Sequence, residues 1–167
     1  MAKTVLYAGD GIKTFIPQRE HMLLVDKLFS VSENDVETGL TVADSNIFVE
    51  DGVLSETGLI EHIAQSAATF AGYNDWINKR PIVLGYIAEI KKFALQSALP
   101  KTGDNIETYM TVVSQAMNIT LMNAESKVNG VTVAVCFCLR EGFIASGSVY
   151  DLVSPHLMHL SCAVDSL

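Results

Sequence analysis

The chain has 167 residues, of which 49% are apolar, and its formal net charge is -8. This length predicts one domain with a sizeable core. The acidic balance, with no run rich in Lys and Arg, argues against nucleic acid as a partner, because phosphate binding needs clustered positive charge. An acidic carrier protein would need a local basic patch, and the candidates are Lys91 and Lys92, with Arg19 or with Lys79 and Arg80.

The beginning of the chain, Met-Ala-Lys-Thr-Val-Leu-Tyr, lacks the long apolar region of a signal peptide, and no stretch of about 18 apolar residues follows. We therefore expect a soluble, cytoplasmic protein with no membrane partner. The cysteines Cys136, Cys138 and Cys162 match neither a Cys-x-x-Cys site nor a disulfide framework. They are interpreted as small apolar side chains in a reducing compartment.

The first third of the chain predicts a hairpin. Residues 1–20 are mixed, with a turn signal at Gly9-Asp10-Gly11. Residues 21–32 and 36–43 have strand-like composition, and the Ser-Glu-Asn-Asp run between them is typical of a turn. Residues 44–54 are irregular.

A long helix is predicted from residue 56 to residue 72, with Ser55 as its N-cap and Gly72 near its end. At 100° per residue, one face carries Leu59, Ile60, Ile63, Ala64, Ala67, Phe70 and Ala71. The other face carries Glu61, His62, Gln65, Ser66 and Thr69. The alanines would let a sheet pack close to this helix.

Four strand-like stretches follow the helix, at residues 82–95, 105–118, 119–127 and 131–140. Turn signals lie at residues 101–104 and at Asn129-Gly130, the latter a strong hairpin signal. One helix cannot cover so many strands unless the sheet curls around it. The sequence thus predicts an α+β domain over residues 1–141, with a curved antiparallel sheet of five to six strands around a central helix. Residues 142–167 form an unassigned C-terminal tail.

Three stretches, in this order, resemble the β-hydroxyacyl-acyl carrier protein dehydratases. Ile-Pro-Gln-Arg-Glu-His-Met-Leu-Leu-Val-Asp at 16–26 is similar to that family's opening Leu-Pro-His-Arg-x-Pro-Phe-Leu-Leu-Val-Asp. Gly-Leu-Ile-Glu-His-Ile-Ala-Gln at 58–65 resembles its helix motif Leu-x-x-Glu-x-x-Ala-Gln. Leu-Gly-Tyr-Ile-Ala-Glu-Ile-Lys-Lys-Phe at 84–93, followed by Pro-Lys-Thr-Gly-Asp at 100–104, is similar to its Lys-Phe strand and Pro-Gly-Asp turn.

The resemblance implies a hotdog fold that dimerises by joining two sheets, with two active sites in tunnels at the interface. In that family a His in a loop before the helix removes the α-proton. A helix Glu from the other subunit helps the β-hydroxyl leave, and backbone amides near the helix start polarise the thioester carbonyl. The resemblance makes Glu61 the first candidate catalytic residue.

The loop at 46–58 departs from the family because it contains neither His nor Pro and is shorter. Gln18 also stands where the opening motif has His. The candidates to replace the missing base are Glu50 and Asp51, which lie near its expected position, and His21 beside the opening strand.

Four residues are candidates for substrate binding. Asp51-Gly52 could form a turn that presents amides, and Gly58 permits close approach of the substrate. Gln65 follows Glu61 at i+4 and could hydrogen-bond its carboxylate. Phe48, in the loop before the helix, completes the set.

The remaining histidines are given no catalytic role. His62 points about 100° away from Glu61 and is interpreted as a structural histidine. His156 and His159 have no neighbours that would complete a metal site, so no metal is expected. The sequence also has no Gly-rich phosphate loop and no Gly-x-Ser-x-Gly elbow.

Three hypotheses remain. The first is a dehydratase-like protein acting on acyl thioesters of acyl carrier protein or coenzyme A, and the second is a thioesterase using one helix carboxylate. The third is a non-catalytic partner subunit of a dehydratase. The substrate is expected to be carried on phosphopantetheine with no further cofactor, and a homodimer or higher homo-oligomer is expected. A homodimer without a bound partner would argue against the third hypothesis, and co-purification with a His-bearing related chain would favour it.

Overall fold

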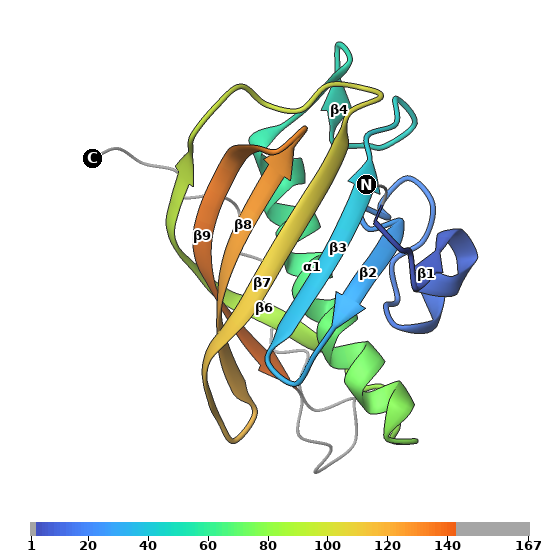
Figure 1. Cartoon of the computed structure of the whole chain (residues 1–167), viewed down its shortest axis with the longest axis vertical. Helices are drawn as coiled ribbons and strands as arrows, with labels where there is room; N and C mark the ends of the chain where they lie inside the picture. The colour runs from blue at the N-terminus through green and yellow to red at the C-terminus, as the bar shows by residue number, and fades with distance from the viewer. Residues whose placement is uncertain (1–2, 143–167) are drawn as a thin grey trace, which may run out of the picture.

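One long helix lies along the inner face of a curved antiparallel sheet in the computed structural model, which describes residues 3–142 (Figure 1). Within those residues the sheet has seven strands in the order β1-β2-β3-β7-β8-β9-β6. They are β1 (Tyr7–Ala8), β2 (Lys27–Val31), β3 (Asp35–Thr41), β6 (Gly85–Leu95), β7 (Asn105–Ala116), β8 (Ile119–Val128) and β9 (Val131–Gly142). A short hairpin, β4 (Val49–Glu50) and β5 (Val53–Leu54), precedes helix α1 (Glu56–Ile77), and a 3-10 helix, η1, spans Gly9–Thr14. The expected α+β architecture is confirmed, and the two-residue β1 is the strand beyond the predicted five to six.

Helix α1 begins where its cap predicts. Ser55 is extended (φ -64°, ψ 160°), and its hydroxyl accepts a hydrogen bond from the Gly58 N–H at 3.1 Å.

The predicted end of the helix at Gly72 is wrong, because α1 continues to Ile77. A Cβ on Gly72 would overlap the Phe15 carbonyl group, 2.9 Å from its carbon, so this glycine admits a close backbone contact. Phe15 then packs edge-on against Tyr73 and Trp76, with ring centroids 5.5 and 5.7 Å apart. These contacts hold the last turns of the helix.

Residues 21–26 do not extend the first long strand, which starts only at Lys27. Instead, Gln65 of α1 binds this segment. Its side-chain oxygen accepts from the Leu24 N–H, and its amide nitrogen donates to the Met22 carbonyl, both at 2.8 Å. Backbone groups that a strand would pair are satisfied by the helix.

The β8–β9 hairpin turns at Asn129 (φ 51°) and Gly130 (φ 78°), as predicted. In β9 the small side chains of Ala134, Cys136 and Cys138 are buried, and the bulkier residues between them are only half-buried. Small inward side chains let the sheet approach the helix closely. Burial raises the pKa of Cys136 to about 11 and that of Cys138 to about 12, so both are neutral thiols at pH 7. Cys162, like His156 and His159, lies outside the described residues.

Strand β6 ends the sheet. It pairs with β9 on one side, and its other edge has no strand partner within residues 3–142. Over the same residues, no helix is both long enough and apolar enough to cross a membrane.

Candidate functional site

Glu61 lies half-buried in the second turn of α1, beside the first residues of β6. It lines a cavity of about 300 Å³. The other lining residues are Gln18, Ala64, Ala68, Gly85, Tyr86, Ile87 and Arg140. Glu61, Ala64 and Ala68 follow one another at helical spacing, so they form one stripe of the helix. This arrangement places one carboxylate at the side of the cavity next to β6, the edge strand of the sheet within residues 3–142.

Gln65 holds Glu61 in place. Its side-chain nitrogen donates to Glu61 Oε1 at 2.9 Å, as the i+4 spacing predicts. The same side chain is bonded to the backbone of Met22 and Leu24, so both polar atoms of the amide are occupied by protein groups. Gln65 therefore positions Glu61 in this structure, and its predicted contact with substrate stays a prediction.

The polar face of α1 is not turned to solvent. His62, Gln65, Ser66 and Thr69 are all buried, whereas Ala64 and Ala71 of the predicted apolar face are half-buried. Periodicity separates the two faces of the helix but does not say which one faces the sheet. Here the inner face of the sheet supplies hydroxyl groups to the polar one. Ser66 Oγ, for example, donates to the His62 carbonyl and accepts from Thr38 of β3.

His62 is a structural histidine, as interpreted from the sequence. Its Nδ1 bonds to the Leu24 carbonyl, which can only accept, so Nδ1 carries the proton. Nε2 then accepts from Thr108 Oγ1 at 2.7 Å, and Thr108 in turn accepts from Ser126. Complete burial lowers the pKa of His62 to about 4, although the bond to Leu24 opposes the shift. A neutral imidazole with both nitrogens occupied does not act as a base.

Two residues of the Glu61 cavity were missed as site residues. Gln18 Oε1 and Arg140 Nε are buried and have no hydrogen-bond partner within residues 3–142. Arg140 lies two residues beyond Cys138, so it belongs to the inward-facing register of β9. The signal available in the sequence was that Arg140 continues the alternating series of buried residues in β9, a position that is unusual for a cation. Nothing in the local sequence connects it to Glu61.

The residues proposed to replace the missing base lie in the β4–β5 hairpin, away from the Glu61 cavity of the same chain. Glu50 and Asp51 are exposed at its turn, where Asp51 (φ 51°) and Gly52 (φ 73°) both adopt positive φ. The hairpin is fixed to the segment after β6, because Thr102 N donates to the Gly52 carbonyl at 2.9 Å and Leu54 N donates to the Pro100 carbonyl at 2.8 Å.

Phe48 and Gly58 meet at the start of the helix. A Cβ on Gly58 would overlap the side chains of Phe48 and Leu54, so this glycine makes room for protein side chains. The predicted contacts of Phe48, Gly52 and Gly58 with substrate stay predictions.

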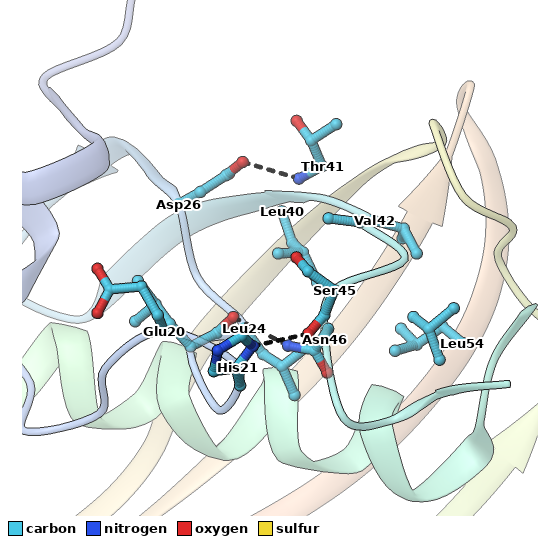
Figure 2. Close-up of a pocket in the computed structure, with 13 residues that line it drawn as sticks. Glu20, His21, Leu24, Asp26, Leu40, Thr41, Val42, Ser45, Asn46 and Leu54 are labelled. Atoms are coloured by element: carbon cyan, nitrogen blue, oxygen red, sulfur yellow. Dashed lines mark hydrogen bonds between the residues drawn. The ribbon is translucent and has the colours of Figure 1, made fainter. Parts of the chain in front are cut away.

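His21 belongs to a different cavity, of about 390 Å³, between residues 20–26 and 40–54 (Figure 2). Its Nδ1 lies 3.1 Å from the Ser45 carbonyl, and its backbone has φ 70°. On the wall of the same cavity, Asp26 accepts from the Thr41 N–H at 3.0 Å. Glu61 does not line this cavity, so His21 and Glu61 are not brought together within one chain.

The candidate basic patch is divided between two regions. Lys91 and Lys92 are exposed on β6, where Lys91 pairs with Glu89 at 3.1 Å. Arg80, beyond the end of α1, pairs with Asp75 at 3.0 Å. Within residues 3–142 no group of three or more His, Cys, Asp or Glu side chains could hold a metal ion.

A curved antiparallel sheet around one central helix defines the chain as a hotdog-fold protein, and comparisons with known proteins agree. The family model described as ApeP-like, ApeP dehydratase, matches residues 11–137. The chain belongs to this ApeP-like family. No curated protein matches the sequence.

Among solved structures, the dehydratase heterocomplex ApeI:P from Xenorhabdus doucetiae superposes with a TM-score of 0.74 at 20% identity, over 80% of this chain and 91% of that chain. A hypothetical thioesterase with coenzyme A from Streptococcus pneumoniae gives 0.56 at 12% identity, over 70% and 84%. The E. coli PaaI protein of the phenylacetic acid degradation operon gives 0.54 at 12% identity, over 68% and 80%. At these identities the likeness establishes the hotdog fold.

Proposed function

We propose that this chain is a hotdog subunit that removes water from 3-hydroxyacyl thioesters carried on phosphopantetheine, with Glu61 as its catalytic carboxyl group. The observation that carries the proposal is the placement of Glu61, half-buried on the central helix beside a cavity of about 300 Å³. Membership of a family described as ApeP dehydratase supports the reaction class.

The reaction requires two proton transfers. A base takes the proton from Cα, the Cα–Cβ double bond forms, and the β-hydroxyl leaves as water after receiving a proton. Glu61 supplies the proton to the leaving hydroxyl. No histidine lines its cavity within residues 3–142, so the base must reach the substrate from elsewhere.

A second subunit could pair with the outer edge of β6, which has no strand partner within residues 3–142. If two β6 strands pair antiparallel, the first residues of one strand lie opposite the last residues of the other. Glu61 is beside the beginning of β6, and the β4–β5 hairpin is fixed to the segment after its end. Such pairing brings the hairpin of one subunit towards Glu61 of its partner.

We therefore propose that the site is completed across β6 by a second hotdog chain. In a homodimer the hairpin contributes Glu50 and Asp51, and a carboxylate there would act as the base. In a pair with a related chain, that chain contributes its own base. The likeness to a protein described as a dehydratase heterocomplex favours the second arrangement.

A thioesterase is the second candidate. One carboxylate can serve as the base or nucleophile in hydrolysis, and the Glu61 cavity offers one. The likeness to a protein described as a hypothetical thioesterase with coenzyme A favours this reading over other functions.

The test is to incubate the full-length chain, alone and with a co-expressed hotdog partner, with 3-hydroxyacyl thioesters of carrier protein and of coenzyme A. Mass spectrometry follows the products. Glu61→Gln is run beside Glu56→Gln, an exposed carboxylate in the first turn of the same helix. Loss of one water that disappears in Glu61→Gln and persists in Glu56→Gln supports the dehydratase. Free thiol without loss of water points to the thioesterase, and no product under any condition overturns both.

A further inference from the structure

The side chain of Arg140 is an unpaired cation inside the Glu61 cavity. Its Nε is buried without a partner, and its only hydrogen bond among the described residues is a long one, 3.4 Å from an Nη to the Val83 carbonyl. No carboxylate of residues 3–142 lies within ion-pair distance of it; Asp75, which attracts it from farther away, pairs with Arg80 at 3.0 Å. Burying a guanidinium without acceptors is costly, so an acceptor from outside the described residues is expected there.

The fold holds Arg140 in this position. A Cβ on Gly85 would lie 2.6 Å from the Arg140 Cζ, so the guanidinium occupies the space that any other residue at 85 would fill. Gln18 Oε1, the other buried polar atom without a partner in the described residues, belongs to the same cavity. Both orphan groups of the described chain therefore lie around one space, which also contains Glu61.

Arg140 is shared between the Glu61 cavity and a second, neighbouring cavity of about 460 Å³. The stripe of α1 that begins with Glu61 continues through Ala64 and Ala68 in the first cavity to Ala71 in the second. From Glu61 to Ala71 the helix rises roughly 15 Å. A chain-like group with its reacting carbons at Glu61 would lie along these alanines and pass Arg140.

We propose that Arg140 is a specificity-determining residue that binds an oxygen acceptor, a hydroxyl or carboxylate oxygen, on the distal part of the acyl chain. The proposal rests on the proposed function, because it takes Glu61 as the end where the thioester reacts. A plain hydrocarbon chain would leave the guanidinium unpaired, whereas an oxygen on the chain would accept its N–H groups. The preferred substrates are thus acyl chains that carry oxygen beyond the reacting carbons.

The test measures dissociation constants by calorimetry in the Glu61→Gln background, so that turnover does not interfere. The full-length chain, alone and in complex with a co-expressed hotdog partner, is titrated with 3-hydroxyacyl pantetheine thioesters of equal length. Their chains end in a methyl group, a hydroxyl or a carboxylate. We expect the oxygen-bearing chains to bind about tenfold tighter or more than the methyl-terminated chain at matched length.

Variants assign the preference to Arg140. Arg140→Met should bring the three dissociation constants to within about twofold of one another, and Arg140→Lys should retain part of the preference because it keeps the charge. Lys127→Met, which removes a cation paired with Glu125 on β8, should leave the preference intact. If Arg140→Met fails to fold, the ratio of dissociation constants between methyl-terminated and oxygen-bearing chains, measured with Arg140 in place, still tests the proposal.

Equal binding of all three chains would overturn the inference while leaving the proposed function standing, provided that wild type still removes water. A change of oligomeric state in Arg140→Met without any change of preference would also overturn it, and would assign the acceptor to a partner subunit. Failure to bind any thioester, both alone and in the complex with the hotdog partner, would overturn both the inference and the function.

Discussion

The two sides of helix α1 use polar residues in opposite ways. Towards the sheet, His62 and Ser66 are buried, and each polar atom is bonded to a protein group. Towards β6, Glu61 is half-buried beside Gln18 and Arg140, whose buried atoms have no partner in the described chain. A satisfied buried network stabilises the fold, whereas unsatisfied groups around a cavity are available to a ligand. Burial alone does not distinguish the two sides, but hydrogen-bond satisfaction does.

Replacing Glu61 should give the largest effect, and it should change turnover without changing stability. Glu61→Gln keeps the shape of the side chain and removes its acid and base chemistry, so the rate of water loss should fall about 100-fold or more. Its midpoint of urea unfolding should remain close to that of wild type, because only one partly exposed hydrogen bond changes. Product formation followed by mass spectrometry, and urea titration followed by circular dichroism, measure the two effects.

Substitutions on the sheet-facing side of α1 should lower the free energy of unfolding. His62→Ala leaves the Leu24 carbonyl and the Thr108 hydroxyl without their partner and opens a cavity, which should lower the free energy of unfolding by about 4 kcal/mol. Urea denaturation measures this loss. An effect as small as that of an exposed-residue control such as Ser30→Ala would show that the network contributes little.

Acidification should reduce the stability that the sheet-facing side of α1 contributes. The folded-state pKa of His62, about 4, is below the ordinary value of about 6.5, so the unfolded chain binds the proton more tightly. The stabilisation from neutral His62 is therefore complete above pH 6.5 and is lost as the pH falls towards 4. The loss attributable to His62 should reach about 3 kcal/mol. Unfolding free energies measured from pH 7.5 to 4 should fall less steeply in His62→Gln than in wild type.

The smallest effect is expected at the margin of the network. Ser66→Ala removes the hydroxyl that accepts from Thr38 and donates to the His62 carbonyl, and should cost about 1 kcal/mol. The helix itself remains, since alanine is the best helix former. A stabilised Ser66→Ala variant, detected by urea denaturation, would mean that the hydroxyl pair is not a net contributor.

Local signals in the sequence predicted much of the fold. Ser55 marks the start of α1, Asn129-Gly130 marks the β8–β9 turn, and the i+4 spacing predicts the bond between Gln65 and Glu61. Each of these depends on residues close together in the chain.

The failures involve contacts between distant residues. Gly72 was interpreted as a helix stop because its contact with the Phe15 backbone, 57 positions earlier, is invisible locally. Residues 21–26 have strand composition, but Gln65 binds their backbone. Arg140 joins the Glu61 cavity only because β9 pairs with β6 beside the helix. Periodicity also left open which face of α1 is buried, since it does not register the hydroxyl groups that the sheet supplies.

The most direct test of the account is a crossed comparison of two neighbouring residues, Glu61→Gln and His62→Gln. For each variant, the rate of water loss from a 3-hydroxyacyl thioester is measured with fully folded protein, together with the urea midpoint. The account predicts that Glu61→Gln loses turnover and keeps its midpoint, while His62→Gln lowers the midpoint and keeps turnover. Retained turnover in Glu61→Gln, with loss of turnover in folded His62→Gln, would contradict it.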